Sequence, residues 1–320
     1  MKIKNKFKLA LMSSSKGKIL FYKIRVLREK YIMATKNDET YIREVFAQRF
    51  GREINLKDPK TLSEKLQWLK LFYRDDRLPI CSDKFEVHNY LESIGYGYLG
   101  NKVIGVYENA KDIDYNSLPN KFVAKATHGS GWNLIVKNKN DINWNDSVKL
   151  MNSWLKLNLF AFGREWNYKD IKPRIVVEEF INHEPLNDYK FMCYNGEPLY
   201  MQLNNDFNGK HYVDFYDLKT WEHIPATYSD YKFSERTIEK PEQFDKMMEL
   251  ARELSKPFPF VRVDFYSFDD TILLGELTFF PAGGLRPFLP RGYGFNELMG
   301  KQLKLPEPNY NLSLYKKINS

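Results

Sequence analysis

Residues 122–133, with the sequence FVAKATHGSGWN, combine a lysine with a glycine-bearing loop and could bind phosphate. The apolar start predicts a strand that carries Lys125 to its end, and Gly129 and Gly131 allow unusual backbone conformations and close approach to a ligand. Backbone N–H groups turned toward phosphate oxygens, together with the Lys125 charge, would suit a nucleotide. The segment also fits a plain hairpin whose glycines only form the turn, and it matches neither a P-loop nor a Rossmann fingerprint.

Two neighbouring segments, VRVDFY and LGELTFFP, could hold a metal ion. Arg262 and Asp264 are two positions apart on a predicted strand, so they share one face, as do Glu276 and Thr278 on the next. If the strands pair, Asp264 and Glu276 can converge on one divalent ion, and hard oxygen ligands are those that Mg²⁺ prefers. Arg262 could then stabilise charge on a transferred phosphoryl group. The alternative is a solvent-facing strand pair with an Arg–Asp ion pair.

A third segment, RIVVEEFI at 174–181, is an apolar strand that runs into two acids. Its exposed backbone could recognise an adenine edge, and a carboxylate could bind ribose hydroxyls; a solvated strand end is the alternative. Shortly after it, Lys190 alternates with Tyr189 and Phe191, so its side chain points away from theirs.

These segments need a scaffold of short strands and helices. Apolar runs predict strands at 102–107, 121–126, 134–137, 174–181, 189–194, 199–203, 211–215, 260–266 and 272–277. Helices are predicted at 41–50, from the capping box at Thr61 and Glu64 to Leu71, from Asp83 to about Gly95, at 145–161 and at 241–254. Asn195 and Gly196 indicate a hairpin. Hairpins with intervening helices favour an α+β fold over a regular parallel array.

The charge of the chain is concentrated at its N-terminus. The 320 residues carry a formal charge of +8, but residues 1–35 hold ten basic residues and one acid, so the remainder is near neutral. A nucleic-acid binder would spread basic and aromatic residues over its folded body, so no nucleic-acid partner is expected. Apolar residues interleave with the basic ones in this arm, which fits either a helix on an anionic membrane surface or a basic helix packed on the body.

The cysteine content and the hydropathy of the chain indicate in which cellular compartment the protein is expected. The two cysteines, Cys81 and Cys193, form neither a disulfide framework nor a metal cluster, so a reducing cytoplasm is expected. No stretch reaches the roughly 18 apolar residues of a membrane-spanning helix. Peripheral contact through residues 1–35 would place the protein at the inner face of the plasma membrane.

Taken together, the motifs resemble the ATP-grasp superfamily. The segment SDK ending at Lys84 looks like the one that supplies a first phosphate-binding lysine, and Lys125 looks like the second. The resemblance implies two α+β lobes that clasp ATP, behind a helical basic N-terminal extension. It implies that ATP is bound by Lys84, Lys125, His128, Gly129, Ser130, Gly131, Glu178, Glu179, Phe180, Ile181, Asp188 and Lys190.

The resemblance also implies a catalytic set and a metal set. Arg262, Lys190 and His128 would act in catalysis, although His128 could equally only shape its loop. Asp264, Glu276 and Thr278 would hold Mg²⁺. Thr278 stands where the superfamily usually has asparagine, so one bridging Mg²⁺ is the better supported expectation.

Within the superfamily, the chain resembles the TupA-like ATP-grasp family. Residues 55–68 (NLKDPKTLSEKLQW), the loop KATHGSG and the segment DYKF carry this resemblance. The family is associated with teichuronopeptide and other bacterial surface-polysaccharide gene clusters. The resemblance implies a carboxylate–amine ligase of capsule or cell-surface polysaccharide biosynthesis, in which ATP phosphorylates a carboxylate and an amine then displaces phosphate. The substrate would be a small molecule or a polysaccharide precursor.

Three other functions stay open. An ATP-grasp kinase would transfer phosphate to a sugar hydroxyl. A glycosyltransferase would need a nucleotide-sugar site, for which Asp112 and Asp114 offer one short Asp-x-Asp pattern. A non-catalytic module could bind a membrane through the basic arm.

We expect the chain to have four parts: a basic arm at 1–40, a helical and N-terminal lobe at 41–120, a small ATP-grasp lobe with the phosphate loop at 121–181, and a large lobe with the metal site at 182–320. The oligomeric state is left open.

Overall fold

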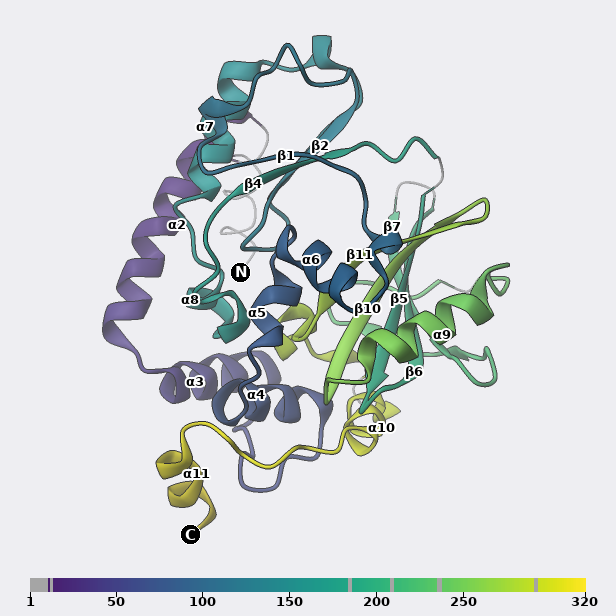
Figure 1. The fold of residues 1–320 in the computed structure, drawn as a ribbon. Coiled ribbons are helices and arrows are strands. Elements are labelled where there is room, and N and C mark those ends of the chain that lie inside the picture. The colour runs from purple at the N-terminus through teal and green to yellow at the C-terminus, as the bar shows by residue number, and fades with distance from the viewer. Residues whose placement is uncertain (1–10, 12–13, 184–185, 208–209, 235–237, 291–292) are drawn as a thin grey trace. The chain divides into compact units, whose positions relative to one another are not determined.

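The computed structural model describes residues 11, 14–183, 186–207, 210–234, 238–290 and 293–320. The remaining residues of the basic arm, 1–10, 12 and 13, lie outside the described residues. The chain forms two compact units, Met1–Asn37 with Asp76–Asn182 (unit 1) and Asp38–Asp75 with His183–Ser320 (unit 2). Figure 1 labels most of their helices and strands. The α+β class is confirmed, and the four ranges expected as domains stay predictions.

Unit 1 is built on a four-stranded antiparallel sheet in the order β1-β4-β2-β3. Its strands are β1 (Val103–Tyr107), β2 (Phe122–Ala126), β3 (Asn133–Val136) and β4 (Ile175–Glu179). Along β2, Phe122, Ala124 and Ala126 enter the hydrophobic core. Because side chains alternate along a strand, Lys125 projects from the opposite face.

The helices of unit 1 correct one sequence prediction and confirm another. The single helix expected at 145–161 is wrong, because α7 (Trp144–Trp154) and α8 (Phe160–Gly163) are separate. The Asn158 side chain accepts a hydrogen bond from the Phe160 backbone N–H (3.0 Å), and asparagine competes in this way with helix continuation. The cap predicted at Asp83 is confirmed, because its Oδ1 accepts hydrogen bonds from the Phe85 and Glu86 backbone N–H groups (2.8 and 3.2 Å) at the start of α6 (Glu86–Ser93). Helix α5 (Arg77–Ser82) precedes it and was not predicted.

The described part of the basic arm is a helix, α2 (Ser15–Thr35), which packs against α7 and α8 (Figure 1). Tyr22 enters the core of unit 1, and the Arg25 guanidinium lies 4.5 Å from the centre of the Phe162 ring. Glu29 is 5% exposed and accepts a hydrogen bond from the Asn158 backbone N–H (2.9 Å). One face of the arm is therefore part of the folded unit.

Unit 2 contains a six-stranded antiparallel sheet in the order β11-β10-β5-β6-β7-β8. Its strands are β5 (Asn187–Tyr194), β6 (Glu197–Phe207), β7 (Lys210–Asp217), β8 (His223–Ile224), β10 (Phe260–Phe268) and β11 (Thr271–Thr278). A small sheet joins β9 (Thr227–Tyr228) to β12 (Phe288–Leu289). Helix α9 (Phe244–Ser255) packs on β5, β6 and β10.

The other helices of unit 2 are α3 (Asp38–Phe50), α4 (Leu62–Phe72), α10 (Phe295–Gln302) and α11 (Leu312–Asn319). The predicted capping box is confirmed at the start of α4: Thr61 accepts from the Glu64 N–H, and the Glu64 carboxylate accepts from the Thr61 N–H (3.0 Å). Helix α4 packs against α10.

Tight turns set the register of the sheet in unit 2. The predicted hairpin is confirmed between β5 and β6, where Asn195 and Gly196 have positive φ of 50° and 86°. Between β10 and β11, Asp269 has a φ of 45°. These residue types tolerate such conformations, so the neighbouring strands return directly alongside.

No helix in the described ranges is both long and apolar enough to cross a membrane.

The docked face of α2 leads to a pH-dependent stability. Burial raises the pKa of Glu29 from 4.5 to about 7, against the opposing effects of the Asn158 hydrogen bond and Arg25. The folded state therefore holds this proton more tightly than the unfolded state, and Glu29 costs stability as pH rises from 4.5 to 7. We expect Glu29→Gln to stabilise the protein by about 1–3 kcal/mol more at pH 8 than at pH 5, measured by chemical denaturation.

The matched control is Glu92→Gln, which changes an exposed carboxylate of the same unit. It should show no such dependence, and an equal effect of Glu29→Gln at the two pH values would contradict the prediction.

Candidate functional site

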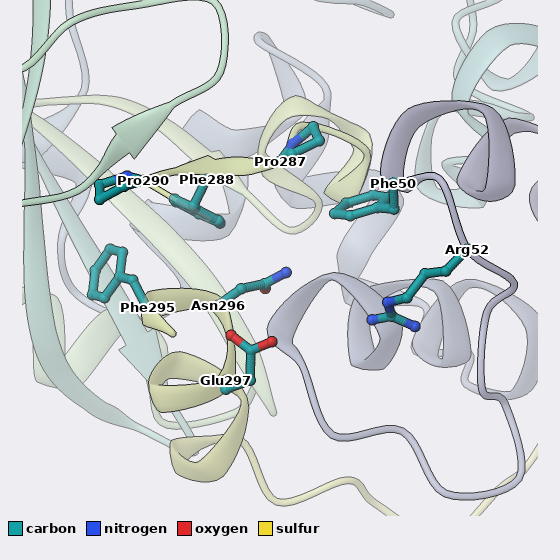
Figure 2. A pocket seen from close by; sticks show the side chains of 8 residues that line it. All are labelled: Phe50, Arg52, Pro287, Phe288, Pro290, Phe295, Asn296 and Glu297. Atoms are coloured by element: carbon teal, nitrogen blue, oxygen red, sulfur yellow. The ribbon is translucent and has the colours of Figure 1, made fainter. Parts of the chain in front are cut away.

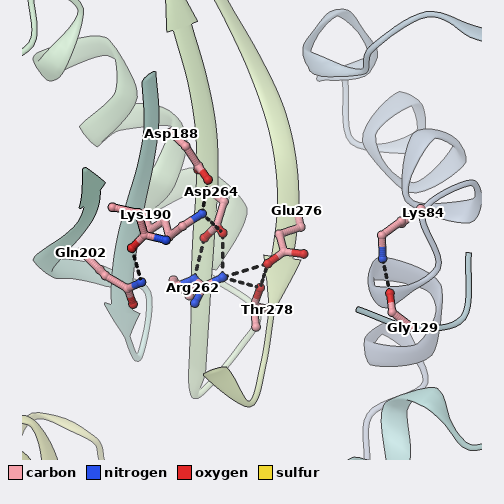
Figure 3. Close-up of polar contacts among 10 residues, drawn as sticks. Lys84, Gly129, Asp188, Lys190, Gln202, Arg262, Asp264, Glu276 and Thr278 are labelled. Atoms are coloured by element: carbon pink, nitrogen blue, oxygen red, sulfur yellow. Dashed lines mark hydrogen bonds and ion pairs between the residues drawn. The ribbon is translucent and has the colours of Figure 1, made fainter. Parts of the chain in front are cut away.

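The predicted metal-binding strands pair as the sequence suggests. In the register of β10 and β11, Asp264 lies opposite Glu276 and Arg262 lies opposite Thr278. On the other side of β10, Lys190 of β5 lies opposite Asp264. Directly opposed residues of antiparallel strands point to the same face, so all five side chains share one side of the sheet (Figure 3).

Ion pairs and hydrogen bonds join these side chains into one cluster. Arg262 donates to both Asp264 oxygens (2.7 Å each), to Glu276 Oε1 (2.8 Å) and to Thr278 Oγ1 (3.2 Å). Lys190 Nζ donates to Asp264 Oδ2 (2.9 Å) and to Asp188. Thr278 donates to Glu276 Oε1 (2.7 Å). We call Asp188, Lys190, Arg262, Asp264, Glu276 and Thr278 the ion cluster.

Burial controls the protonation of the ion cluster. Asp264 is 1% exposed, and burial raises its pKa from 3.8 to about 6, although Arg262 and Lys190 oppose the rise. Burial alone would lower the pKa of Lys190 and of Arg262, but the nearby carboxylates outweigh it and both pKa values are raised. Both cations therefore stay charged at neutral pH, and Lys190 acts as a fixed positive charge and not as a base.

The chemistry of the donor set fits magnesium. Asp264, Glu276 and Thr278 present two carboxylates and a hydroxyl on neighbouring strands, all hard oxygen donors. Among the described residues, no group of three or more His, Cys, Asp or Glu side chains is arranged to hold a metal. A Mg²⁺ ion here would thus complete its coordination with water and phosphate oxygens, as this ion commonly does.

Unit 1 holds the predicted phosphate-binding lysines. Lys125 Nζ donates to Glu178 Oε2 (2.8 Å), joining β2 to β4, and Asn101 Nδ2 donates to the same oxygen (3.1 Å). The Lys84 backbone N–H donates to the Thr127 carbonyl (3.2 Å), and Lys84 Nζ donates to the Gly129 carbonyl (Figure 3). Lys84 is therefore bonded directly to the glycine loop, whereas Lys125 is bonded to Glu178, and all of them lie in unit 1.

The two loop glycines are required for different reasons. A Cβ on Gly129 would approach the buried Trp132 ring to 2.3 Å, so only glycine fits there. Gly131 has a φ of +73° with open space around it, so its backbone conformation is the constraint. Ser130, between them, is exposed. The loop is thus anchored at one glycine and exposed at its tip.

His128 points away from this exposed tip. It is buried, and its Nε2 lies 3.1 Å from the Trp154 carbonyl oxygen in the core of unit 1. Burial lowers its pKa, and the charge of Lys84 adds to that effect. A neutral imidazole against a helix end fits a role in shaping the loop, one of the two roles that the sequence left open.

The predicted adenine segment follows β4. Glu178 is buried, whereas Glu179 is exposed and pairs with Lys102 (2.5 Å). Phe180 and Ile181 are half-buried, and the Lys121 ammonium lies 5.8 Å from the centre of the Phe180 ring. An aromatic and an aliphatic surface are therefore present at the end of β4.

The predicted site residues thus form two groups, each inside one unit. Unit 1 brings together Lys84, Lys125, residues 128–131 and residues 178–181. Unit 2 brings together the ion cluster. Their roles toward ATP and Mg²⁺ stay predictions.

Sequence reasoning missed several residues beside these groups. Asn101 bonds Glu178, and the pKa of His88 is lowered by burial while the charges of Glu178 and Lys125 also act on it. Arg174 bonds Asp83, next to Lys84, at 2.9 Å. Asn101 and His88 belong to no local motif, and Arg174 opens the segment RIVVEEFI without a predicted role, so only the structure reveals these contacts.

Gln202 of β6 was also missed. It lies opposite Lys190 in the sheet and is buried, and its Oε1 has no hydrogen-bond partner among the described residues. Its position within an alternating strand was the only available sequence signal. A buried amide oxygen of this kind is a place where a bound molecule could donate a hydrogen bond.

A pocket of about 160 Å³ lies within unit 2 (Figure 2). It is lined by Phe50, Arg52, Pro287, Phe288, Pro290, Phe295, Asn296 and Glu297. The Tyr228 ring packs against Phe288 of this pocket (4.8 Å between ring centres). None of the predicted site residues lines this pocket.

A family model described as TupA-like ATPgrasp matches residues 64–304. The chain belongs to the TupA-like ATP-grasp family. No curated protein matches it.

Solved structures with a similar fold include D-alanine–D-alanine ligases. The enzyme from Bacillus anthracis, complexed with ATP, is 16% identical over 62% of this chain, with a TM-score of 0.38, and the match spans 55% of that ligase. The enzyme from Helicobacter pylori is 14% identical over 78% of this chain and 70% of its own, with a TM-score of 0.38. The ATP-grasp ligase PsnB, complexed with a precursor variant, Mg and ADP, is 11% identical over 76% of this chain and 65% of its own, with a TM-score of 0.39.

The burial of the ion cluster predicts a large stability effect. Arg262→Met removes the main partner of the buried Asp264 carboxylate and should destabilise the protein by about 3–5 kcal/mol in urea unfolding. The control is Arg252→Met, which removes an exposed bidentate pair with Glu197 in the same unit and should cost less than about 1 kcal/mol. Equal losses in the two variants would show that the cluster is not energetically distinct from a surface pair.

Proposed function

We propose that this protein is an ATP-dependent carboxylate–amine ligase that acts in the assembly of a bacterial surface polysaccharide. Membership of the TupA-like ATP-grasp family supports the use of ATP. The observation that carries the proposal is the ion cluster, where two carboxylates and a hydroxyl lie beside a buried arginine on neighbouring strands. This is the set of groups that a phosphoryl transfer through a metal–nucleotide complex needs.

In the proposed reaction, a substrate carboxylate oxygen attacks the γ-phosphorus of ATP and the bond from that phosphorus to the β–γ bridging oxygen breaks. ADP leaves and an acyl phosphate remains. An amine nitrogen then attacks the acyl carbon, the carbon–oxygen bond to phosphate breaks, and the nitrogen loses a proton. The products are an amide, ADP and phosphate.

The residues of unit 1 would bind the nucleotide. Lys84 and Lys125 would place two positive charges on the phosphates, and residues 129–131 would cover them with backbone N–H groups. Residues 178–181 would bind adenine and ribose. The Glu178 carboxylate holds the Lys125 ammonium at 2.8 Å, which orients that charge before a nucleotide binds.

The residues of unit 2 would serve the reacting phosphoryl group. Asp264, Glu276 and Thr278 would hold Mg²⁺, which supplies positive charge to the phosphates when bound. Arg262 would stabilise the charge that develops on the transferred phosphoryl group. Lys190 remains protonated because Asp264 and Asp188 stabilise its charge, so it would orient Asp264 and neutralise part of the cluster.

Nucleotide binding is tested by thermal shift. Mg·ATP should raise the melting temperature of the wild-type protein, and Lys125→Gln should reduce that shift several-fold because one phosphate-binding charge is lost. Asp264→Asn with Glu276→Gln should remove the part of the shift that depends on Mg²⁺.

The matched control is Lys149→Gln, which removes an exposed lysine of unit 1 that pairs with Asp146 and should keep the full shift. No shift of the wild-type protein with Mg·ATP would count against the whole proposal.

The reaction class is tested by product analysis. The protein is incubated with Mg·ATP, candidate uronic or amino acids and an amine, and products are identified by mass spectrometry. An amide formed together with ADP supports the ligase. A stable phosphosugar would instead identify a kinase, and sugar transfer from a nucleotide sugar without ATP would identify a glycosyltransferase.

The glycosyltransferase alternative has little support in the described residues. Asp112 and Asp114 are both exposed, and Asp114 accepts a hydrogen bond from the Asn116 backbone N–H (3.0 Å) as part of a turn. This arrangement is that of a solvated turn. The polysaccharide part of the proposal rests on the association of the family with surface-polysaccharide gene clusters.

A further inference from the structure

Helix α2 has a second apolar face that does not pack on unit 1. Leu20, Ile24, Leu27 and Tyr31 follow one another at spacings of four, three and four residues and are 49%, 48%, 69% and 67% exposed. At 100° per residue, this stripe lies on the side of the helix opposite Glu29, which is buried against unit 1. On the docked side, Ile19, Tyr22 and Val26 pack on the core of unit 1, so the helix is apolar on two opposite sides.

Packing within the unit explains only one of these sides. A helix that packs on one side of a folded domain usually presents a polar outer face to water. A continuous exposed apolar stripe instead marks an interaction surface. The docked side is stabilised by Tyr22 in the core and by the stacking of Arg25 on Phe162, so these contacts do not need the exposed leucines.

The charges beside the stripe identify the kind of partner. Lys16, Lys23 and Lys30 are exposed along one border of the stripe, and Arg28 is exposed along the other. The only acidic residue of the helix is Glu29, which is buried on the docked side. The exposed face thus combines an apolar centre with an uninterrupted positive border.

We propose that the exposed face of α2 binds an anionic lipid surface, with the helix lying in the membrane plane. Leu20, Ile24 and Leu27 would enter the boundary between headgroups and acyl chains, and Tyr31 would lie at headgroup level. The lysines would reach anionic headgroups through their flexible side chains. A second copy of the chain fits this surface less well, because two such faces would bring like charges together. The inference does not depend on the proposed ligase activity.

The proposal is tested by sedimentation of the full-length protein with vesicles. One set contains phosphatidylcholine with about 30% phosphatidylglycerol, a composition chosen to supply anionic headgroups, and the other contains phosphatidylcholine alone. The protein should bind the anionic set and be released by about 0.5 M salt, which screens charge at short distances. Leu20→Ser with Leu27→Ser, and separately Lys16→Gln with Lys23→Gln and Lys30→Gln, should each weaken binding by about 10-fold or more.

Matched controls remove the same groups elsewhere in unit 1. Tyr98→Ser with Ile135→Ser deletes two residues that are 63% and 55% exposed, and Lys111→Gln with Lys149→Gln and Lys156→Gln removes three exposed lysines. Both controls should bind within about twofold of the wild-type protein. Unchanged melting temperatures establish that the variants are folded, and the lysine variant tests the proposal through surface charge alone.

Three results would overturn the proposal. The first is equal binding of the wild-type protein to neutral and anionic vesicles. The second is vesicle binding by the α2 variants that matches the controls. The third is a dimer in light scattering that requires Leu20 and Leu27 while vesicles are not bound, which would assign the face to a second copy of the chain.

Discussion

The buried carboxylate of Asp264 constrains the pairing of the central strands in the sheet of unit 2. Burying an ion is costly unless well-placed partners compensate it, and here the partners come from two strands, Arg262 on β10 and Lys190 on β5. A slip of one residue in β5 would turn Lys190 toward the apolar side, where Phe191 packs against Phe265 with ring centres 5.8 Å apart. The register of these strands therefore satisfies charge on one face and packing on the other.

Unit 1 also contains a buried acid, Glu178, that hydrogen bonds from neighbouring side chains stabilise. Glu178 on β4 is buried, and it receives hydrogen bonds from Lys125 on the neighbouring strand β2 and from the Asn101 side chain. Thus each unit holds an acid and a lysine together across paired strands. In unit 1 the lysine lies beside a glycine loop, whereas in unit 2 it lies beside an arginine and two further acids. These different neighbours support the proposed nucleotide-binding role of the unit 1 residues and the proposed phosphoryl-transfer role of the ion cluster.

Much of this arrangement could be predicted from local sequence. Alternation along two short apolar runs, joined by turn residues, predicted that Asp264 and Glu276 converge if the strands pair, and the pairing of β10 with β11 places them opposite one another. The glycine loop and the capping box at Thr61 were predictable for the same reason, because their constraints act within a few residues. The single helix predicted at 145–161 was wrong, because the Asn158 side chain accepts a hydrogen bond from the Phe160 backbone N–H. The helical pattern of the sequence does not show that this local hydrogen bond forms.

What could not be predicted depends on residues far apart in the chain. Lys190 bonds Asp264 only because β5 pairs with β10, and neither strand carries a local signal of that partner. Asn101 and Gln202 have no motif at all. The sequence of α2 was ambiguous for another reason: its apolar residues surround much of the helix, so only the structure separates the docked side from the exposed one.

The docking of α2 determines how the N-terminal region can be manipulated. Arg164 is buried, and its guanidinium donates to the Lys36 carbonyl (2.8 Å) just beyond this helix, while the Asn158 N–H donates to Glu29. A shortened chain that begins after the arm 1–40 would lose these acceptors and would uncover the aromatic surface now covered by Tyr22 and Arg25. The clustered charge at the N-terminus suggests a tail that could be removed. Because of these contacts, a recombinant protein must keep helix α2 for unit 1 to stay intact.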